Sequence, residues 1–294
     1  MKSTNSARRK PISVAEAWDW VVDNFPFPGY IVPRRRSAYE ELVREALAVR
    51  PAGSRVLDFG AGPADKTALF ALAGYQVVAY DDFLDPWHLV DGNIDKILSF
   101  ARGAGIDYRA GPDPWALLKD ESFDVIMLHH VLEHLHDSPR ALLLRLMEHL
   151  RPGGVLYVTV PNAVNIRKRL AVLFGRTNYP SYPSFYWYPG PFRGYIREYV
   201  FGDLRALSGY LDLRNTRLRS YFHFPHAAPA PVLMALRTLS LLAPGWRDSL
   251  MLIGEKPREW RPEMQRSGVS LAESLGRGEY YDYEGFDPQT DVAD

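Results

Sequence analysis

The sequence predicts an α/β fold in which helices cover both faces of a mostly parallel sheet. From residue 54 onward, short apolar runs typical of buried strands alternate with helical patterns, and such alternation implies parallel strands joined by helices. The first strand runs directly into the glycine turn of "VLDFGAGPADKT", residues 56–67. A strand, a glycine turn and a helix N-terminus form a cradle for a nucleotide-like ligand, so we expect a ligand site there.

Two helices are expected before the sheet. Ser13 is a suitable N-cap for a helix over residues 13–24, and residues 37–49 have an amphipathic pattern. Strands and helices then alternate to the end of the domain. The expected strands are 55–59, 76–80, 106–110, 123–129, 154–160, 213–222 and 248–257, and the expected helices among them are 65–73, about 90–103, 116–119, 138–150, 202–210 and 229–243.

The chain is expected to have three regions. Residues 1–50 form N-terminal helices or a cap, residues 51–257 form the main domain, and residues 258–294 form a polar, acidic tail. Within the main domain the alternation breaks at about 163–201, where Tyr, Phe, Trp and Pro are dense and the spacing predicts no helix. This segment is expected to be an insert in the α/β domain.

Composition argues against several classes of protein. The formal net charge is zero, which gives no electrostatic reason to expect a nucleic-acid partner. No cysteine is present, which excludes disulfides and thiolate metal sites and fits a reducing, cytoplasmic location. We expect neither a secretory signal nor a membrane span, because the most apolar stretch, residues 226–246, contains Arg237 and is interrupted by prolines.

The second strand indicates which ligand the glycine turn receives. It ends in "VVAYDD", about 20 residues after the turn, where dinucleotide folds place an acid that bonds a ribose hydroxyl. The turn itself reads D-F-G-A-G-P and lacks a third glycine. Asp58 at the strand tip would repel a pyrophosphate but suit a cationic amino-acid group. We therefore expect an adenosine compound other than a dinucleotide.

Four segments resemble the successive motifs of class I S-adenosylmethionine-dependent methyltransferases: "VLDFGAGPADKT", "VVAYDD", "SFDVIMLHHVLEHLHD" and "LRPGGVLYVTVPN". The resemblance is strong over about 40–160 and weaker over 200–257. It implies a Rossmann-like, doubly wound seven-stranded sheet with an antiparallel last strand, and S-adenosyl-L-methionine as the cofactor. The chain looks most like type 11 or type 23 methyltransferases, which include small-molecule O-methyltransferases and enzymes encoded with glycan and exopolysaccharide genes.

The resemblance also implies cofactor contacts. The glycine turn would cradle the methionine portion, the acid after the second strand would hold the ribose hydroxyls, and the tip of the third strand would flank the adenine. His129, at the end of the fourth strand, would face the sulfonium. The residues expected to bind the cofactor are Asp58, Phe59, Gly60, Ala61, Gly62, Asp81, Asp82, Phe83, Asp113, Trp115 and His129.

Four histidines and two acids lie in "HHVLEHLHD", residues 129–137. His134 is favoured as the general base that takes the proton of an acceptor hydroxyl, because the pKa of histidine lies near working pH. Related small-molecule methyltransferases often have a histidine there. On a helical turn His130, Glu133 and His134 would share a face, which makes His130 and Glu133 further catalytic candidates. Alternatively the cluster has only a structural role.

A metal site on the same face is the other alternative. Ubiquinone-pathway and small-RNA O-methyltransferases have E-x-x-E-H, whereas here His130 replaces the first glutamate. The change disfavours magnesium, and a nitrogen-rich site of His130, Glu133 and His134 would favour zinc, iron or nickel. No metal is expected as a cofactor.

The insert lies where the resemblance implies a substrate cap. "FRGYIREY" resembles a segment of methyltransferases encoded with glycan enzymes, with Tyr195 in place of the usual histidine. Aromatic faces stack on sugars and arginines bind phosphate or carboxylate, so the expected acceptor is a hydroxyl of a sugar or another small molecule. The residues expected at the substrate are Tyr186, Trp187, Arg193, Tyr195, Arg197 and Tyr199.

Other functions stay open at this point. They are N-methylation of a small metabolite or amino sugar, metal-dependent O-methylation, and a binding protein without activity. The aromatic insert could also be only a small hydrophobic cap with solvated arginines.

The apolar segment 229–243 has three interpretations. As a crossover helix between two strands it would bury a wide face, and this interpretation is favoured. It could instead rest on a membrane surface or form a homodimer contact.

Overall fold

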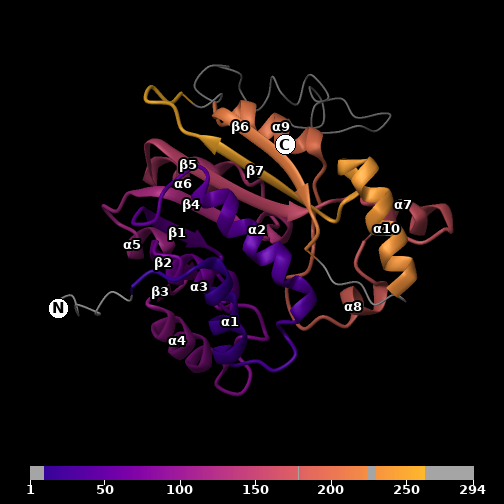
Figure 1. Ribbon diagram of the computed structural model, residues 1–294, viewed down its shortest axis with the longest axis horizontal. Coiled ribbons are helices and arrows are strands. Elements are labelled where there is room, and N and C mark those ends of the chain that lie inside the picture. Colours follow the sequence, from indigo (N-terminus) through magenta and orange to yellow (C-terminus); the bar gives the residue numbers. More distant parts are fainter. Residues whose placement is uncertain (1–9, 178, 224–229, 262–294) are drawn as a thin grey trace, which may run out of the picture.

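The computed structural model describes residues 10–177, 179–223 and 230–261 (Figure 1). The described strands form one sheet in the order β3-β2-β1-β4-β5-β7-β6. The strands are β1 (Arg55–Phe59), β2 (Gln76–Asp81), β3 (Asp107–Ala110), β4 (Phe123–His129), β5 (Leu150–Pro161), β6 (Arg214–Tyr221) and β7 (Ser249–Glu255). β7 runs antiparallel to β5 and β6, and the other pairings are parallel. The expected seven-stranded α/β fold with an antiparallel last strand is therefore confirmed.

Helices cover both faces of this sheet (Figure 1). They are α1 (Val14–Asn24), α2 (Arg36–Leu47), α3 (Asp65–Leu72), α4 (Asn93–Ala104), α5 (Pro114–Leu117), α6 (Arg140–His149), α7 (Ile166–Leu173), α8 (Tyr182–Tyr186), α9 (Phe201–Tyr210) and α10 (Ala230–Leu242), with 3₁₀ turns η1 (Pro33–Arg35), η2 (Leu132–His134) and η3 (Pro244–Trp246). Successive strand residues point to opposite faces. Val56 accordingly packs in one buried cluster with α1 to α4, and Leu57 packs in the other with α6 and α9.

The first helix begins where the sequence predicts. Oγ of Ser13 accepts a hydrogen bond from the Glu16 backbone N–H, and the Glu16 carboxylate accepts one from the Ser13 N–H at 2.8 Å. This reciprocal capping box fixes the start of α1. Trp18 and Val21 are buried in the same cluster as the sheet residues, so the N-terminal helices share a core with the main domain.

The insert contains two short helices that the spacing does not predict. The side chain of Asn165 accepts a hydrogen bond from the Lys168 N–H and starts α7, while Ser181 accepts one from the Ser184 N–H and starts α8. The prediction of a helix-free segment at 163–201 is therefore wrong. Side-chain caps can start a short helix where apolar periodicity is weak, because they satisfy N–H groups that the helix itself leaves unpaired.

Helix α10 does not cross over the sheet. It connects β6 and β7, which are antiparallel neighbours, and such strands need no crossover connection. It lies beside α7 (Figure 1) and leaves Met234, Leu239 and Leu241 exposed. The predicted crossover connection is thus wrong, and the width of the face that the helix buries stays a prediction. Contact with a membrane surface or with a second copy of the chain stays a prediction.

The carboxyl ends of the parallel strands meet at one edge of the sheet, which is where open α/β sheets bind ligands. The segments that follow β1, β2, β4 and β5 at this edge carry most of the residues expected in the site. None of the helices in the described part of the chain has the length and apolar character needed to cross a bilayer. The expected acidic tail lies outside the described residues from residue 262 onward.

Candidate active site

The turn after β1 requires glycine at residue 60. The φ angle of Gly60 is +76°, in the region that side chains rarely adopt, and a Cβ atom there would lie 2.7 Å from Cγ2 of Val131. The segment after β4 therefore packs directly on the turn. Gly62 also has a positive φ, of +53°, with open space where a Cβ would stand. The first glycine permits close packing, and the second leaves room beside the turn.

Asp58, just before this turn, is a buried acid with one unpaired oxygen. Its Oδ2 accepts a hydrogen bond of 2.6 Å from Oγ1 of Thr67, whereas its buried Oδ1 has no hydrogen-bond partner among the described residues. Burial raises the pKa of Asp58 to about 7. A cationic ligand group beside Oδ1 would stabilise the ionised carboxylate.

The acid at the end of β2 is held by backbone N–H groups. Oδ2 of Asp81 accepts from the Gly62 N–H at 2.8 Å, and Oδ1 accepts from the Phe83 N–H at 2.9 Å. Each carboxylate oxygen can accept further hydrogen bonds, so Asp81 can also receive two hydroxyl donors. The ring of Phe83 stacks on Tyr108 at 5.3 Å, and the hydroxyl of Tyr108 donates to the Gly62 carbonyl at 2.6 Å.

Asp82 and Arg193 bind each other. Nη1 and Nη2 of Arg193 lie 3.2 and 3.0 Å from Oδ1 and Oδ2 of Asp82. The sequence predicts Asp82 at the cofactor and Arg193 at the substrate. The structure joins the two predicted sites through this pair, because Arg193 belongs to the insert and Asp82 follows β2.

The residues after β3 and at the end of β4 have local partners. Oδ1 of Asp113 accepts from the Trp115 and Ala116 N–H groups at the start of α5. The Trp115 ring stacks on Phe59 at 6.1 Å. His129 is buried with Nδ1 3.1 Å from Oγ1 of Thr159. These contacts fix the three predicted cofactor residues, and their roles toward a cofactor stay predictions.

His130 and Glu133 form a buried pair. Nδ1 of His130 lies 2.9 Å from Oε1 of Glu133, Nε2 lies 3.4 Å from the Tyr221 hydroxyl, and the ring stacks on His223 at 4.6 Å. Burial lowers the pKa of His130 to about 3 and raises that of Glu133 to about 7. The low pKa and the contacts at both ring nitrogens make His130 a weaker candidate base than the sequence predicts.

His134 turns the other way, toward the insert. Its Nδ1 lies 2.7 Å from the Arg193 carbonyl oxygen, which can only accept, so Nδ1 carries the proton and Nε2 is the basic nitrogen of the neutral ring. The Tyr195 ring packs edge-on against it at 5.1 Å. His134 is only half-buried, so its basic nitrogen is the stronger candidate for proton removal.

The expected shared face of His130, Glu133 and His134 is only partly formed. Glu133 and His134 lie on a single 3₁₀ turn and His130 lies two residues before it, so the α-helical spacing behind the prediction does not apply. Among the residues that the structure describes, no group of three or more His, Cys, Asp or Glu side chains is placed to hold a metal ion.

The observed cradle fits S-adenosyl-L-methionine. The unpaired Oδ1 of Asp58 suits the ammonium group of an amino acid, and the doubly anchored carboxylate of Asp81 suits a ribose diol. The open space at Gly62 and the missing pyrophosphate-type glycine pattern agree with that ligand.

The family model described as a methyltransferase domain matches residues 32–199, more than half of the chain. The chain belongs to this methyltransferase family. The expectation of a class I methyltransferase drawn from the four sequence motifs is thereby confirmed at the level of family and fold. The matched residues include the glycine turn, the histidine cluster and most of the insert.

Curated relatives are similar to part of the chain. A ubiquinone biosynthesis O-methyltransferase of Xanthomonas axonopodis pv. citri is 34% identical over 126 residues, which are 42% of this chain and 50% of the relative. A demethylmenaquinone methyltransferase of Renibacterium salmoninarum is 27% identical over 207 residues, 70% of this chain and 73% of the relative. The chain spans about half the length of the ubiquinone-pathway relatives it matches.

A solved structure has a similar fold. It is a cyclopropane-fatty-acyl-phospholipid synthase-like protein of Lactobacillus casei, 14% identical, with a TM-score of 0.51 over 82% of this chain and 99% of that one. At this identity the likeness concerns the fold alone.

The remaining residues predicted at the substrate have different surroundings. Tyr199 is buried and its hydroxyl donates to the Leu132 carbonyl at 3.4 Å, so it ties the insert to η2. Arg197 pairs with Asp203 at 3.5 Å. Tyr186 and Trp187 lie exposed on and after α8. The ring of Tyr195 packs against the His134 ring. Of the aromatic residues predicted at the substrate, Tyr195 is therefore the one in contact with the candidate base.

The sequence analysis does not single out several further residues that lie near the histidine cluster. Tyr39 of α2 donates a hydrogen bond to Oδ2 of Asp65, and Nζ of Lys66 lies 3.5 Å from the same oxygen. His223, after β6, stacks on both Tyr39 and His130. Asp65 and Lys66 stand in the glycine-turn motif and could have been singled out there. Tyr39 and His223 stand in none of the four motifs, so nothing in the neighbouring sequence indicates a role for them in the site.

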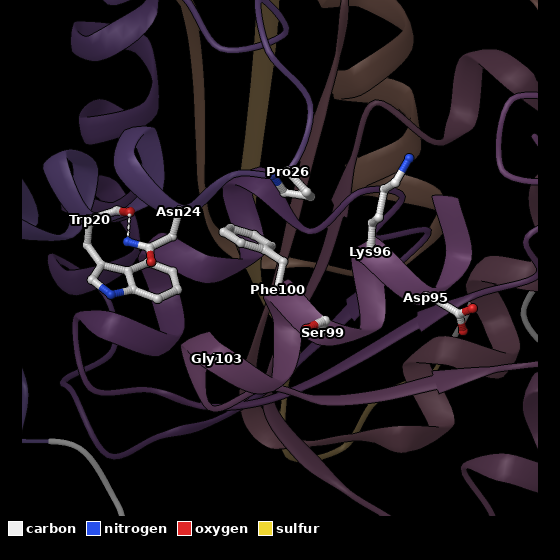
Figure 2. A pocket seen from close by; sticks show the side chains of 8 residues that line it. All are labelled: Trp20, Asn24, Pro26, Asp95, Lys96, Ser99, Phe100 and Gly103. Carbon is white, nitrogen blue, oxygen red and sulfur yellow. Dashed lines mark hydrogen bonds between the residues drawn. The ribbon is translucent and has the colours of Figure 1, made fainter. Parts of the chain in front are cut away.

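A surface hollow of about 480 Å³ lies between α1 and α4 (Figure 2). The Trp20 ring stacks on Phe100 at 5.6 Å, and the Asn24 amide donates to the Trp20 carbonyl at 2.8 Å. None of the residues predicted in the site lines this hollow. The lining residues are Trp20, Asn24, Pro26, Asp95, Lys96, Ser99, Phe100 and Gly103.

Proposed function

We propose that the protein is an S-adenosyl-L-methionine-dependent methyltransferase that methylates a hydroxyl of a sugar or another small molecule, with His134 as the general base. The observation that carries this proposal is the 2.7 Å contact between Nδ1 of His134 and the Arg193 carbonyl. This contact leaves Nε2 as the proton acceptor. The cofactor, when bound, supplies a methyl group activated by its sulfonium.

The chain's own residues bind and orient the reactants. Asp58 holds a cationic amino group through its unpaired Oδ1, and Asp81 holds two hydroxyls while the backbone fixes its position. His134 accepts the hydroxyl proton at Nε2, and the Arg193 carbonyl keeps the ring in the required orientation and tautomer. Alignment and proton removal are the two contributions that such a transfer needs.

The test is a comparison of two histidines in one segment. We expect His134→Gln to keep S-adenosylhomocysteine affinity and lose about 10²–10⁴-fold in turnover. His136→Gln is the matched control, since His136 is exposed and also contacts an insert carbonyl, that of Phe192 at 2.6 Å. A His134 variant that keeps full turnover contradicts the base assignment and favours N-methylation, which needs less base catalysis.

A phenolic hydroxyl is the second candidate acceptor. It is favoured by the similarity to O-methyltransferases named for ubiquinone biosynthesis, which covers 42% of this chain. An acceptor panel with sugars, sugar nucleotides and catechols, read as transfer of radiolabelled methyl, separates the two classes. Product from catechols alone would replace the sugar assignment and leave His134 in its role.

A further inference from the structure

Arg35 carries a guanidinium without an acidic partner. It is the last residue of η1, and its N–H bonds the Val32 carbonyl at 2.9 Å. Its Nη1 donates to the Tyr30 carbonyl at 3.4 Å, whereas its Nε is buried without a hydrogen-bond partner. No carboxylate in the described part of the chain forms an ion pair with it. The next residue, Arg36, pairs with both Asp19 and Glu40.

The charge of Arg35 acts on groups from three elements that are distant in sequence. Burial raises the pKa of Tyr39 and Tyr195 and lowers that of His223, and the charge of Arg35 lowers the pKa of all three groups. These groups belong to α2, the insert and the segment after β6. Arg35 therefore lies within electrostatic range of α2, the insert and the segment after β6.

Ring contacts connect this position to the candidate base. Tyr195 packs edge-on against His134 at 5.1 Å, and His223 stacks on Tyr39 at 6.0 Å and on His130 at 4.6 Å. Tyr195 and His223, on which the charge of Arg35 acts, are thus in direct contact with the histidine cluster. A molecule held by Arg35 would lie beside the candidate base.

The local charges leave Arg35 unneutralised. Lys66 lies 3.5 Å from Asp65, so these two nearby ions pair with each other, and burial raises the pKa of Glu133, which favours its neutral form. Burying an unpaired guanidinium nitrogen costs free energy that an anionic partner offsets. The planar guanidinium matches the two oxygens of a carboxylate or a phosphate.

We propose that Arg35 is an anion-binding residue that holds a carboxylate or phosphate carried by the methyl acceptor. The inference rests on the proposed function, since it concerns the acceptor of that same site. It names acidic sugars, sugar phosphates and hydroxylated aromatic acids as the substrate class. Neutral sugars and simple catechols would lack the contact.

The test measures binding in matched pairs of compounds. The full-length protein, saturated with S-adenosylhomocysteine, is titrated calorimetrically with glucuronate or glucose 6-phosphate against glucose, and with 3,4-dihydroxybenzoate against catechol. We expect at least one acid to bind about tenfold or more tightly than its neutral partner. The sugar acid and the sugar phosphate distinguish carboxylate from phosphate as the recognised group.

Variants assign the preference to one residue. Arg35→Met should abolish it, and Arg35→Lys should keep part of it because the charge stays. Arg34→Met is the matched control, since Arg34 is the exposed neighbour on the same turn. Unchanged S-adenosylhomocysteine affinity and thermal midpoint show that each variant is folded.

Three results overturn the inference. They are equal affinity for acids and neutral partners, no binding of any acid at millimolar concentration, and a preference that survives in Arg35→Met. Turnover is measured separately with the radiolabelled methyl group. An acid that binds through Arg35 but yields no product from wild-type protein contradicts the proposed function and leaves the anion subsite intact.

Discussion

The guanidinium of Arg193 lies on the carboxylate of Asp82, with nitrogen–oxygen distances of 3.2 and 3.0 Å. The carbonyl of the same arginine accepts the hydrogen bond from Nδ1 of His134. One residue of the insert therefore links the end of β2, beside Asp81, to the candidate base. Contacts at the predicted cofactor end of the site and the orientation of the candidate base therefore involve the same loop.

Removing this link should affect turnover more than binding. Both side chains are about one-third exposed, and such ion pairs contribute about 0–1 kcal/mol. We expect Arg193→Met to weaken S-adenosylhomocysteine binding by at most about fivefold, and to lower turnover about tenfold or more because the base loses its position. The checks are calorimetry, steady-state kinetics and the ¹⁵N chemical shifts of the His134 ring.

Arg197→Met is the control for this experiment. Arg197 lies on the same segment but pairs with Asp203 instead. If both arginine variants lose turnover equally, or if the His134 tautomer does not change in Arg193→Met, the positioning role of Arg193 is wrong.

Cofactor affinity should rise with pH through neutrality. Burial raises the pKa of Asp58 to about 7, so the carboxyl is largely protonated below that pH and ionised above it. An ammonium ligand group favours the ionised form. We expect S-adenosylhomocysteine to bind more tightly at about pH 8 than at about pH 6, and Asp58→Asn to bind weakly without this pH dependence. Calorimetric titrations between about pH 6 and about pH 8 measure this dependence. A wild-type affinity that does not change with pH would contradict the assignment of Asp58 to the amino group of the ligand.

Glu133→Gln should make the protein more stable at alkaline pH. Burial raises the pKa of Glu133 from 4.5 to about 7, so the folded state retains a proton that the unfolded chain releases above pH 4.5. The stabilisation from this group is present below the unfolded pKa and is lost as pH rises toward 7, at a cost of up to about 3 kcal/mol. Glutamine removes that loss and can still accept from Nδ1 of His130.

Urea unfolding at about pH 5 and about pH 8 measures this difference. Glu148→Gln is the control, since its side chain is exposed. A Glu133→Gln protein whose stability falls with pH as steeply as wild type would show that Glu133 is not the buried proton-binding group.

The close contact between Gly60 and Val131 predicts a rescue. Gly60→Ala places a Cβ 2.7 Å from the valine side chain and strains a φ of +76°. We expect a loss of stability of about 2 kcal/mol or more and weaker cofactor binding. Adding Val131→Ala should recover the part of the loss that the contact causes.

Gly29→Ala separates strain from contact in the same measurement. Its φ is +78°, with no atom within 4 Å of the added Cβ. A Gly60→Ala loss that equals the Gly29→Ala loss, or that Val131→Ala does not reduce, would mean that backbone strain alone makes glycine necessary at residue 60.

Local sequence predicts the fold better than it predicts the site. The strands were recognisable because buried parallel strands are short apolar runs, and the turn at Gly60 was recognisable because it stands between a strand and a helix. Helix α8 was missed because its start depends on the cap at Ser181, and not on apolar periodicity. Antiparallel pairing of β6 with β7 decided where α10 lies, and strand pairing is a non-local property.

The partners within the site could not be found from spacing. Asp82 and Arg193 are separated by 111 positions, and each was predicted to contact a different ligand. The contact between them forms only when the insert folds back on the end of β2. The same holds for Arg35, whose charge acts on Tyr195 and His223 from other elements.

Calorimetric titration of the purified full-length protein with S-adenosylhomocysteine tests the proposed cofactor site directly. The proposed function predicts micromolar binding that disappears in Asp81→Ala and persists in Asp95→Ala, a change of an exposed acid on α4. Absence of binding by folded wild-type protein, or equal binding by both variants, would contradict the assignment of this cradle to the methyl-donor cofactor.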